Sequence, residues 1–273
     1  MTVLLMGKIS ATVVTLNEED QIRNCLKSVS WCDEIIIVDS HSEDATVEIA
    51  KEFTDKIYTY ERTGYVEPAR QKALSEASGD WILMLDADER VPKSLSSQLR
   101  ELSKDNQVDV VFAPRMNYMF GEWINYAGWW PDYRAILYKP SVVEITTQIH
   151  NGVNFTEDAE KRYLGSEKES AVIHYNYKDI YDFISRMNKY TDIEAQQSDF
   201  SYLKLITSPT KEFINRYLLN KGYKGGIIGL SLSIFMSWYR FLSAIKSWQY
   251  EHLGNEDQII SKYDKIDRDM DLK

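Results

Sequence analysis

The chain has 273 residues and a formal net charge of −10, from 32 basic and 42 acidic side chains. This charge argues against a protein that holds nucleic acid by neutralising phosphates. A content of 44% hydrophobic and 27% charged residues fits a folded domain and neither a disordered chain nor a multi-span membrane protein.

The N-terminal segment MTVLLMGKIS has no basic leader and no apolar run of signal-peptide length. The two cysteines, Cys25 and Cys32, lack the spacing of a zinc site or of a disulfide framework. These features predict a cytoplasmic protein.

From residue 8 to about residue 115, short apolar runs alternate with helical patterns. The apolar runs are ISATVVTL, DEIIIVDS, KIYTY, WILMLDAD and DVVFAPR, and helices are expected between them, including 68–77 and 94–103. Continuous apolar strands are buried on both faces, so the pattern predicts an α/β fold with a mainly parallel, Rossmann-like sheet.

The helical rhythm stops between about residues 118 and 176, where RAILYK, SVVEIT and AVIHYN predict an antiparallel extension of the sheet. Helices are expected near 178–199 and 208–221, followed by a long apolar stretch over 225–250. We therefore predict a nucleotide-sugar-binding and catalytic domain over 1–177 and a C-terminal helical region over 178–273.

Residues 202–248 carry seven basic side chains against the single acidic Glu212. The apolar stretch has a narrow polar stripe, and only about fourteen uncharged residues separate Gly225 from Arg240, short of the ~20 that a membrane-spanning helix needs. The stripe consists of Ser233, Ser237, Arg240, Ser243 and Ser247. An amphipathic helix lying on the cytoplasmic membrane surface fits this pattern; the alternative is a helix packed on the catalytic domain or in a homo-oligomer.

Acidic residues follow two of the predicted parallel strands. Asp39 ends IIIVD, and Asp86 and Asp88 end WILMLDAD. The carboxyl ends of parallel strands share one sheet edge, where ligands bind in open α/β sheets. Two carboxylates two residues apart can hold a divalent cation and a diphosphate, although a polar turn at the strand end would look the same. Asp39 is a suitable acceptor for an imide N–H of a base, or a cap for the next helix.

In order, spacing and strand context, TLNEED, IIIVDSHSEDAT and GDWILMLDADER resemble the family 2 inverting glycosyltransferases of the GT-A fold. The resemblance implies that Thr15, Leu16 and Glu18 line the base and ribose pocket, with Asp39 on the base and Arg70 nearby. It also implies that Asp86 holds the ribose side and Asp88 holds Mn²⁺ or Mg²⁺.

Later segments are similar to the subgroup that includes the lipopolysaccharide-core β-1,4-glucosyltransferases. These segments are GWWPDYRAILYK, TTQIHNGV, AVIHYNYKDIYDFISRMNKYT and FINRYLLNKGYKGGIIGL. The chain departs from the subgroup at His150, which is followed by Asn151 where an acidic residue is usual. His150 is therefore only a candidate for contacting the acceptor or the phosphate.

In the resembling enzymes a late histidine often completes the metal shell, and His174 is the matching position; the alternative is a hydrogen-bonded core histidine. Arg134 can stabilise the departing diphosphate. For the general base we favour Asp132, which its aromatic neighbours could partly desolvate, with Glu144 and Asp158 as rivals. Aromatic candidates for the acceptor site are Trp129, Trp130 and Tyr133.

We therefore expect an inverting, metal-dependent transfer of a hexose, most plausibly glucose from UDP-glucose. The expected acceptor is a cell-envelope glycan or lipid-linked molecule such as lipopolysaccharide, at the inner face of the cell membrane. The alternatives are an inactive nucleotide-sugar-binding scaffold and transfer to a peptide side chain.

Overall fold

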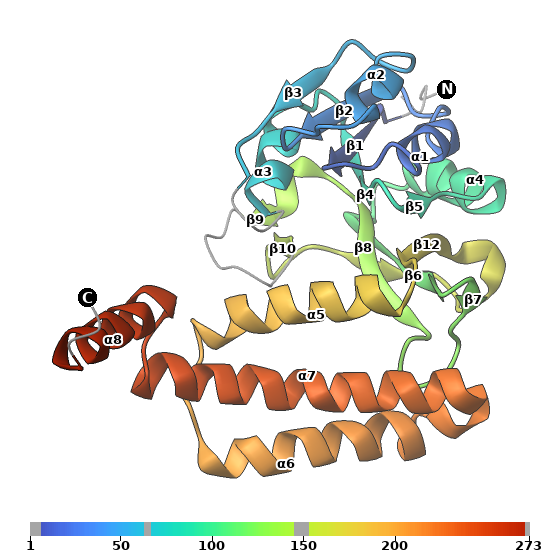
Figure 1. Cartoon of the computed structure of the whole chain (residues 1–273). Helices are drawn as coiled ribbons and strands as arrows, with labels where there is room; N and C mark the ends of the chain where they lie inside the picture. Colours follow the sequence, from blue (N-terminus) through green and yellow to red (C-terminus); the bar gives the residue numbers. More distant parts are fainter. Residues whose placement is uncertain (1–6, 63–66, 145–152, 271–273) are drawn as a thin grey trace, which may run out of the picture. The chain divides into compact units, whose positions relative to one another are not determined.

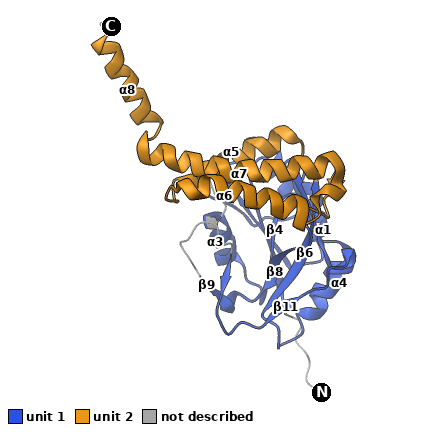
Figure 2. Cartoon of the chain, turned by 90° about the horizontal axis from the view of Figure 1, so that it is seen from below, with its two compact units in different colours: residues 1–118, 130–176 blue, residues 119–129, 177–273 orange. Residues whose placement is uncertain are grey.

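The computed structural model describes residues 7–62, 67–144 and 153–270 and divides into two compact units (Figure 2). The first unit comprises 1–118 and 130–176, and the second comprises 119–129 and 177–273. The predicted boundary at residue 177 assigns 119–129 to the N-terminal domain, whereas the structure groups this segment with the C-terminal helices.

The parallel half of the sheet has the strand order β3-β2-β1-β4 (Figure 1). These strands are β1 (Ile9–Thr15), β2 (Glu34–Asp39), β3 (Ile57–Thr59) and β4 (Trp81–Asp86), and they alternate with α1 (Ile22–Ser28), α2 (Thr46–Ala50) and α3 (Glu67–Glu76). All of β1 and the first five residues of β4 are buried, as expected for strands covered on both faces. The predicted α/β fold is confirmed.

The sheet continues with antiparallel pairing beyond β4. β8 (Asp132–Tyr138) lies between β4 and β6 (Val110–Met119), antiparallel to both, and β12 (Val172–Tyr177) pairs antiparallel with β5 (Glu89–Arg90). The remaining elements of this part are α4 (Lys93–Leu102), β11 (Lys161–Tyr163) beside β6, the two-stranded pair β9 (Val143–Glu144) and β10 (Asn154–Phe155), and 3₁₀ turns at Pro140–Val142 and Lys168–Ser170. The predicted antiparallel extension is confirmed; of the predicted strand SVVEIT, Ser141 and Val142 lie in a 3₁₀ turn, Val143–Glu144 form β9, and the last two residues lie outside the described residues.

A buried carboxylate lies at the amino end of the parallel strands. The side chain of Glu34, at the start of β2, is 4% exposed and accepts hydrogen bonds from Ser10 Oγ, Ser78 N and Ser78 Oγ, and it pairs with Lys56 Nζ. Burial alone would raise the pKa of Glu34, but the ammonium and the three donors outweigh it and lower the pKa to about 2.

A lowered folded-state pKa stabilises the protein above the ordinary value of 4.5, and this stabilisation is lost as pH falls from about 4.5 towards 2. We expect Glu34→Gln to lose about 3 kcal/mol of unfolding free energy at pH 7, and the deficit relative to the wild type to shrink below pH 4. Urea denaturation at pH 7, 4 and 3 measures this, with exposed Glu61→Gln as the control. Equal stability of Glu34→Gln and the wild type at pH 7 would contradict it.

The second unit contains three helices side by side, with α7 in the middle (Figure 1). These are α5 (Ile180–Ala195), α6 (Tyr202–Phe213), which continues as a π-helical turn over Ile214–Leu219, and α7 (Gly226–His252), which follows a 3₁₀ turn at Gly222–Gly225. The short strand β7 (Glu122–Trp123) and the final helix α8 (Glu256–Asp269) belong to the same unit.

Two of these helices differ from the sequence expectation. α6 begins at Tyr202, six residues before the predicted start, because the Ser201 side chain caps it by accepting from Lys204 N, and Pro209 lies inside the helix. α8 was not predicted. An Asn255–Gln258 capping box begins this helix, which has no buried residues.

Candidate functional site

The carboxyl ends of β1, β2 and β4 bring the predicted strand-end residues together. In the parallel register Thr15 pairs with Asp39, and Val14, the residue before Thr15, pairs with Asp86. Thr15 and Asp39 are buried. The three polar side chains therefore lie on neighbouring strands at one edge of the sheet.

Hydrogen bonds join the loops that follow β1 and β2. Asn17 has a φ of 55°, its N–H donates to Ser42 Oγ, and its Oδ1 accepts from Glu43 N. Both oxygens of Asp39 accept from Ser42, at 2.9 Å from N and 2.6 Å from Oγ. Asp39 is thus fixed by its own loop, and it does not cap α2, whose N-cap residue is Ala45.

The other two residues predicted for the base pocket lie on the β1 loop. Leu16 is exposed, and the Glu18 N–H donates to Thr46 Oγ1 at the start of α2. An exposed apolar side chain beside a rigid polar loop is a suitable surface for one face of a planar ring.

Asp86 lies between two guanidinium groups. Arg70 of α3 donates to both carboxylate oxygens, at 2.7 and 3.0 Å, and Arg134 of β8 donates at 2.8 Å. Burial would raise the pKa of Asp86, but the charges of Arg134 and Arg70 hold it well below the ordinary value. Asp86 is therefore an anion at neutral pH.

Glu89 extends this chain of charges, and the sequence reasoning missed it. Its side chain is fully buried, accepts from Asp86 N, and lies 3.4 Å from Arg134 Nη1 and 3.5 Å from Arg115 Nη1. Arg115 in turn pairs with Asp132 at 2.7 Å. Acidic and basic groups thus alternate from Arg70 to Asp132.

Asp88 and His174 lie together, as predicted for the metal site. The imidazole Nε2 is 3.5 Å from Asp88 Oδ2, and the side chains are 9% and 13% exposed for His174 and Asp88 respectively. The β5–β12 pairing places them here, because Glu89 is the register partner of His174 and the Tyr175 N–H donates to Asp88 O.

Asn117 of β6 connects this pair to Asp132. It is fully buried, its Nδ2 donates to Asp132 Oδ2 at 3.1 Å, and its Oδ1 lies 2.6 Å from His174 Nδ1. A carboxylate only accepts hydrogen bonds, so the amide NH₂ must face Asp132 and the amide oxygen must face His174. His174 Nδ1 then carries a proton, and Nε2 faces Asp88 Oδ2.

All the hydrogen bonds that the described residues give to Asp132 fall on one oxygen. Arg115 Nε and Nη2 and Asn117 Nδ2 donate to Oδ2, and the side chain is 30% exposed. Oδ1 accepts from none of the described residues. Asp132 therefore has a fixed orientation and one oxygen that can receive a proton from a ligand. The rival carboxylates Glu144 and Asp158 are exposed, on β9 and on the turn after β10.

The aromatic candidates are divided between the two units. Tyr133 donates its hydroxyl to Leu164 O at 2.9 Å, and Trp130 is half-buried in the same unit. Trp129 belongs to the second unit, where the Arg216 guanidinium lies 5.1 Å from the centre of its ring. His150 lies outside the described residues.

Three buried polar atoms at this edge have no hydrogen-bond partner among the described residues: Thr15 Oγ1, Arg70 Nε and Asp88 Oδ1. Buried polar groups are normally paired, so these three atoms are candidate contacts for a ligand. A hydroxyl and a guanidinium N–H suit ribose or phosphate oxygens, and a carboxylate beside an imidazole suits a divalent cation such as Mn²⁺.

The donors present fit a cation that is only partly held by protein. No group of three His, Cys, Asp or Glu residues within the described ranges is arranged to hold a metal ion. Asp88 and His174 supply two ligands, so a bound cation would need oxygens from a diphosphate or water. Asp86 does not contribute, because both its oxygens bind guanidinium groups.

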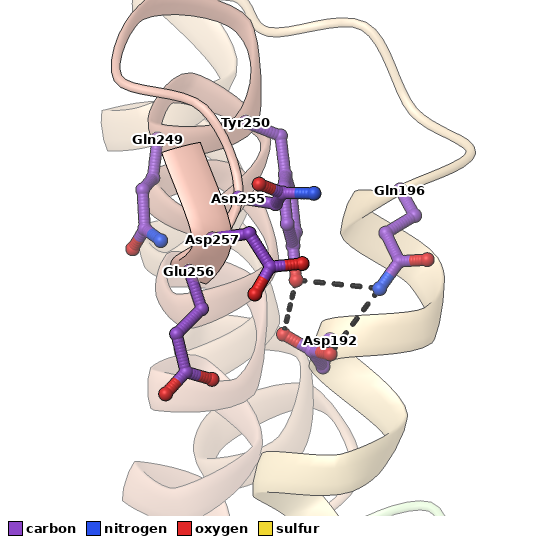
Figure 3. A pocket seen from close by; sticks show the side chains of 7 residues that line it. All are labelled: Asp192, Gln196, Gln249, Tyr250, Asn255, Glu256 and Asp257. Atoms are coloured by element: carbon purple, nitrogen blue, oxygen red, sulfur yellow. Dashed lines mark hydrogen bonds between the residues drawn. The ribbon is translucent and has the colours of Figure 1, made fainter. Parts of the chain in front are cut away.

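A pocket in the second unit lies between α5, the end of α7 and the start of α8 (Figure 3). Its lining includes three acidic residues, but Asp192 accepts hydrogen bonds from Tyr250 and Gln196, and Glu256 and Asp257 occupy the first turn of α8, where negative charge stabilises a helix. These roles account for the acidic residues without a ligand.

Known proteins share sequence and fold features with this chain. The sequence model described as "Glycosyl transferase family 2" matches residues 10–156, more than half of the chain. The "Lipopolysaccharide core biosynthesis glycosyltransferase LpsC" of Rhizobium meliloti (strain 1021) is 27% identical over 88% of this chain and 92% of its own length. The "Uncharacterized glycosyltransferase RC0292" of Rickettsia conorii is 28% identical over 95% and 96%.

Among solved structures, glucosyl-3-phosphoglycerate synthase from Mycobacterium tuberculosis, in complex with Mn²⁺, UDP and glucosyl-3-phosphoglycerate, aligns with a TM-score of 0.35. The identity is 22%, over 41% of this chain and 44% of that one. This similarity is too low to bear on the ligands of the present chain.

Proposed function

The chain belongs to glycosyl transferase family 2, and from this premise we propose that it moves a hexose, with inversion, from a UDP-sugar such as UDP-glucose to a cell-envelope acceptor. It is a glycosyltransferase. The donor, the metal dependence and the acceptor are the proposed parts. The observation that carries the donor and the metal dependence is the group of unpaired buried atoms of Thr15, Arg70 and Asp88 at one sheet edge.

In this proposal the two rigid loops after β1 and β2 hold the nucleoside. Asp39, fixed by Ser42, accepts from the imide N–H of uracil, and Leu16 and Glu18 line the base and ribose pocket. Asp86 serves the ribose side, while Arg70 Nε and Thr15 Oγ1 find partners in the donor. Arg134, already paired with Asp86, adds positive charge near the diphosphate.

Asp88 and His174 would hold the divalent cation, Mn²⁺ or Mg²⁺, whose contribution when bound is to neutralise charge on the departing diphosphate. Asp132 receives the proton of the acceptor hydroxyl at Oδ1, while Arg115 and Asn117 keep its other oxygen in place. Tyr133 and Trp130 lie within two residues of Asp132 in the sequence, and they are the aromatic candidates for contacting one face of the acceptor sugar ring.

The proposed acceptor is a glycan or lipid-linked molecule of the cell envelope, used at the cytoplasmic face of the membrane. The support is the name and the nearly full-length alignment of the lipopolysaccharide core glycosyltransferase. The first unit would carry catalysis, and the second unit would bring the enzyme to the membrane.

Calorimetric titration of UDP, GDP, CMP and dTDP, with Mn²⁺ and then with EDTA, tests the donor and the metal together. We expect UDP to bind most tightly and EDTA to weaken it by at least about tenfold. Failure of every nucleotide to bind would overturn the proposal and favour a scaffold. UDP binding that does not depend on metal would contradict only the proposed role of the divalent cation.

Asn117 offers a separate test, because it fixes the tautomer of His174. We expect Asn117→Ala to weaken Mn²⁺-dependent UDP binding by about 10- to 100-fold, the range for residues that orient a metal ligand. The ¹⁵N shifts of His174 should show that Nδ1 loses its preference for the proton. Calorimetry and nitrogen NMR measure the two effects.

Loss of a buried amide also lowers stability, so the control is a second buried polar group outside the site. Ser103→Ala removes a hydroxyl that donates to Arg100 O. Ser103→Ala should leave both readouts unchanged. An Asn117→Ala protein with the wild-type tautomer and wild-type metal-dependent affinity would reduce Asn117 to a packing role.

A further inference from the structure

The C-terminal helical unit turns the polar stripe of α7 inward. Ser233, Ser243 and Ser247 are buried; Ser233 Oγ donates to Gly229 O, and Ser247 Oγ donates to Ala195 O of α5. Ser237 Oγ donates to Pro209 O of α6. The serines are therefore contacts between or within helices, and the exposed large apolar residues of α7 are Ile227, Ile234 and Trp238.

The basic residues of the stripe are also engaged inside the unit. Arg240 pairs with Glu194 of α5 at 3.6 Å and with Glu212 of α6 at 3.5 Å. Lys246 Nζ donates to Asn188 and Thr191 of α5, and burial lowers its pKa despite the nearby Asp192. Both cations therefore have partners inside the unit.

Large apolar side chains occupy the outward side of α6 and α7. Each is between 48% and 75% exposed, and we name this set the α6–α7 apolar face: Leu203, Ile206, Ile227, Ile234 and Trp238. Trp238 also stacks on Phe241, with ring centres 5.0 Å apart. Monomeric soluble proteins rarely leave a continuous apolar surface of this kind uncovered.

Helical periodicity places these residues on one side of the line of contact between α6 and α7. The Ser237–Pro209 hydrogen bond lies on this line, and the Arg240–Glu212 pair lies on the other side of it. At 100° per residue, Ile234 and Trp238 lie beyond Ser237 on α7, away from Arg240, and Ile206 lies beyond Pro209 on α6, away from Glu212. The two helices thus contribute to the same face.

Four lysines on α6 and on the turn before α7 are exposed, and none has an ion-pair partner within the described ranges: Lys204, Lys211, Lys221 and Lys224. They flank the apolar residues in sequence, and a protein of net charge −10 keeps this segment positive. A segment that combines unpaired cations with exposed Ile, Leu and Trp matches the headgroup boundary of an anionic bilayer, where apolar groups enter and long Lys side chains reach phosphate.

The alternative of a membrane-spanning α7 disagrees with these contacts. By length and composition, Gly222–His252 could cross a bilayer, and 22% of its most apolar window is buried. Spanning would require Arg240 and Lys246 to enter the hydrocarbon region or to leave Glu194, Glu212 and Asn188. Lying in the membrane plane keeps every one of these pairs.

We propose that the α6–α7 apolar face binds an anionic lipid surface in plane, with Lys204, Lys211, Lys221 and Lys224 on the lipid phosphates. The lipid binding itself does not depend on the proposed function. Only its role, which is to bring the enzyme to a membrane acceptor, rests on that function.

The test is flotation of the full chain with vesicles of equal phosphatidylglycerol and phosphatidylcholine. Changing the four lysines to Gln should weaken binding on the order of a hundredfold, and Ile234→Asn with Trp238→Ala should weaken it about tenfold or more. A matched charge control changes four exposed lysines of the first unit: Lys27, Lys51, Lys93 and Lys161. This control should bind as the wild type does.

The outcomes separate lipid binding from catalysis. The lysine variant should bind UDP normally in solution, and a chain that binds vesicles but no nucleotide would contradict only the proposed function. Wild-type vesicle binding by both α6–α7 variants would overturn the inference. So would a concentration-dependent dimer in light scattering that the Ile234 and Trp238 changes dissociate, because the face would then bind a second copy.

Discussion

Asp88→Asn is expected to lower turnover on the order of 10³-fold while the protein stays folded. The change removes a negative charge from an atom that has no partner among the described residues, Asp88 Oδ1, and leaves the core of the sheet untouched. If Asp88 holds the proposed cation, loss of this anionic ligand would weaken cation binding, and the charge on the departing diphosphate would be less well neutralised. Steady-state kinetics over a Mn²⁺ series and a thermal melt measure the two parts.

The matched control is Asp55→Asn, an exposed carboxylate on the loop before β3 at the other end of the strands. It makes the same change of charge and should alter neither turnover nor the metal series. Near wild-type activity of Asp88→Asn would sink the metal assignment. A large fall in melting temperature would instead mean that Asp88 has a structural role.

Asp132→Asn is expected to lower kcat by about 10²- to 10⁴-fold with little change in donor affinity. An amide at this position can still accept from Arg115 and Asn117, so the local structure survives, but it cannot take a proton from the acceptor hydroxyl. In the proposed arrangement, donor binding depends on the strand-end residues and not on this side chain. Kinetics with both substrates varied and UDP calorimetry separate the two quantities.

The rival bases supply the controls. Glu144→Gln and Asp158→Asn should each keep wild-type kcat, because both carboxylates are exposed and neither is oriented by an arginine and an amide as Asp132 is. If either rival lost activity while Asp132→Asn did not, the base would be reassigned. Equal loss of kcat and of UDP affinity in Asp132→Asn would indicate that Arg115, left without its counter-charge, disturbs the donor site.

The parallel half of the fold and its strand-end residues could be predicted because they depend on local pattern. A run such as WILML identifies a strand buried on both faces, and the residue that ends it must lie at the sheet edge. Asp39, Asp86 and Asp88 follow from this rule, whereas Thr15 was predicted from the family resemblance. The structure brings all four to the same edge.

Glu89, Arg115 and Asn117 could not be found in this way. They reach the site through β5–β12 and β6–β8 pairing, and nothing in the sequence fixes the register of such long-range pairs. Glu89 also lies in the charged segment DADER. From the sequence its carboxylate would be taken as exposed, because the arginines that pair with it, Arg115 and Arg134, are distant in the chain. Local pattern likewise identified the polar stripe of α7 but not the side on which its partners lie.

The segment from Met119 to Trp129 has a consequence for how the chain can be divided. Its Met119 and Ile124 are fully buried in one apolar cluster with Phe183, Met187 and Leu232. The helical unit is thus assembled from two separate stretches of chain, and cutting after residue 177 would strip the shorter stretch of its packing. A homologue could exchange its helical unit only by replacing an internal loop and the C-terminal third together, so the unit is not a tail that can be swapped alone.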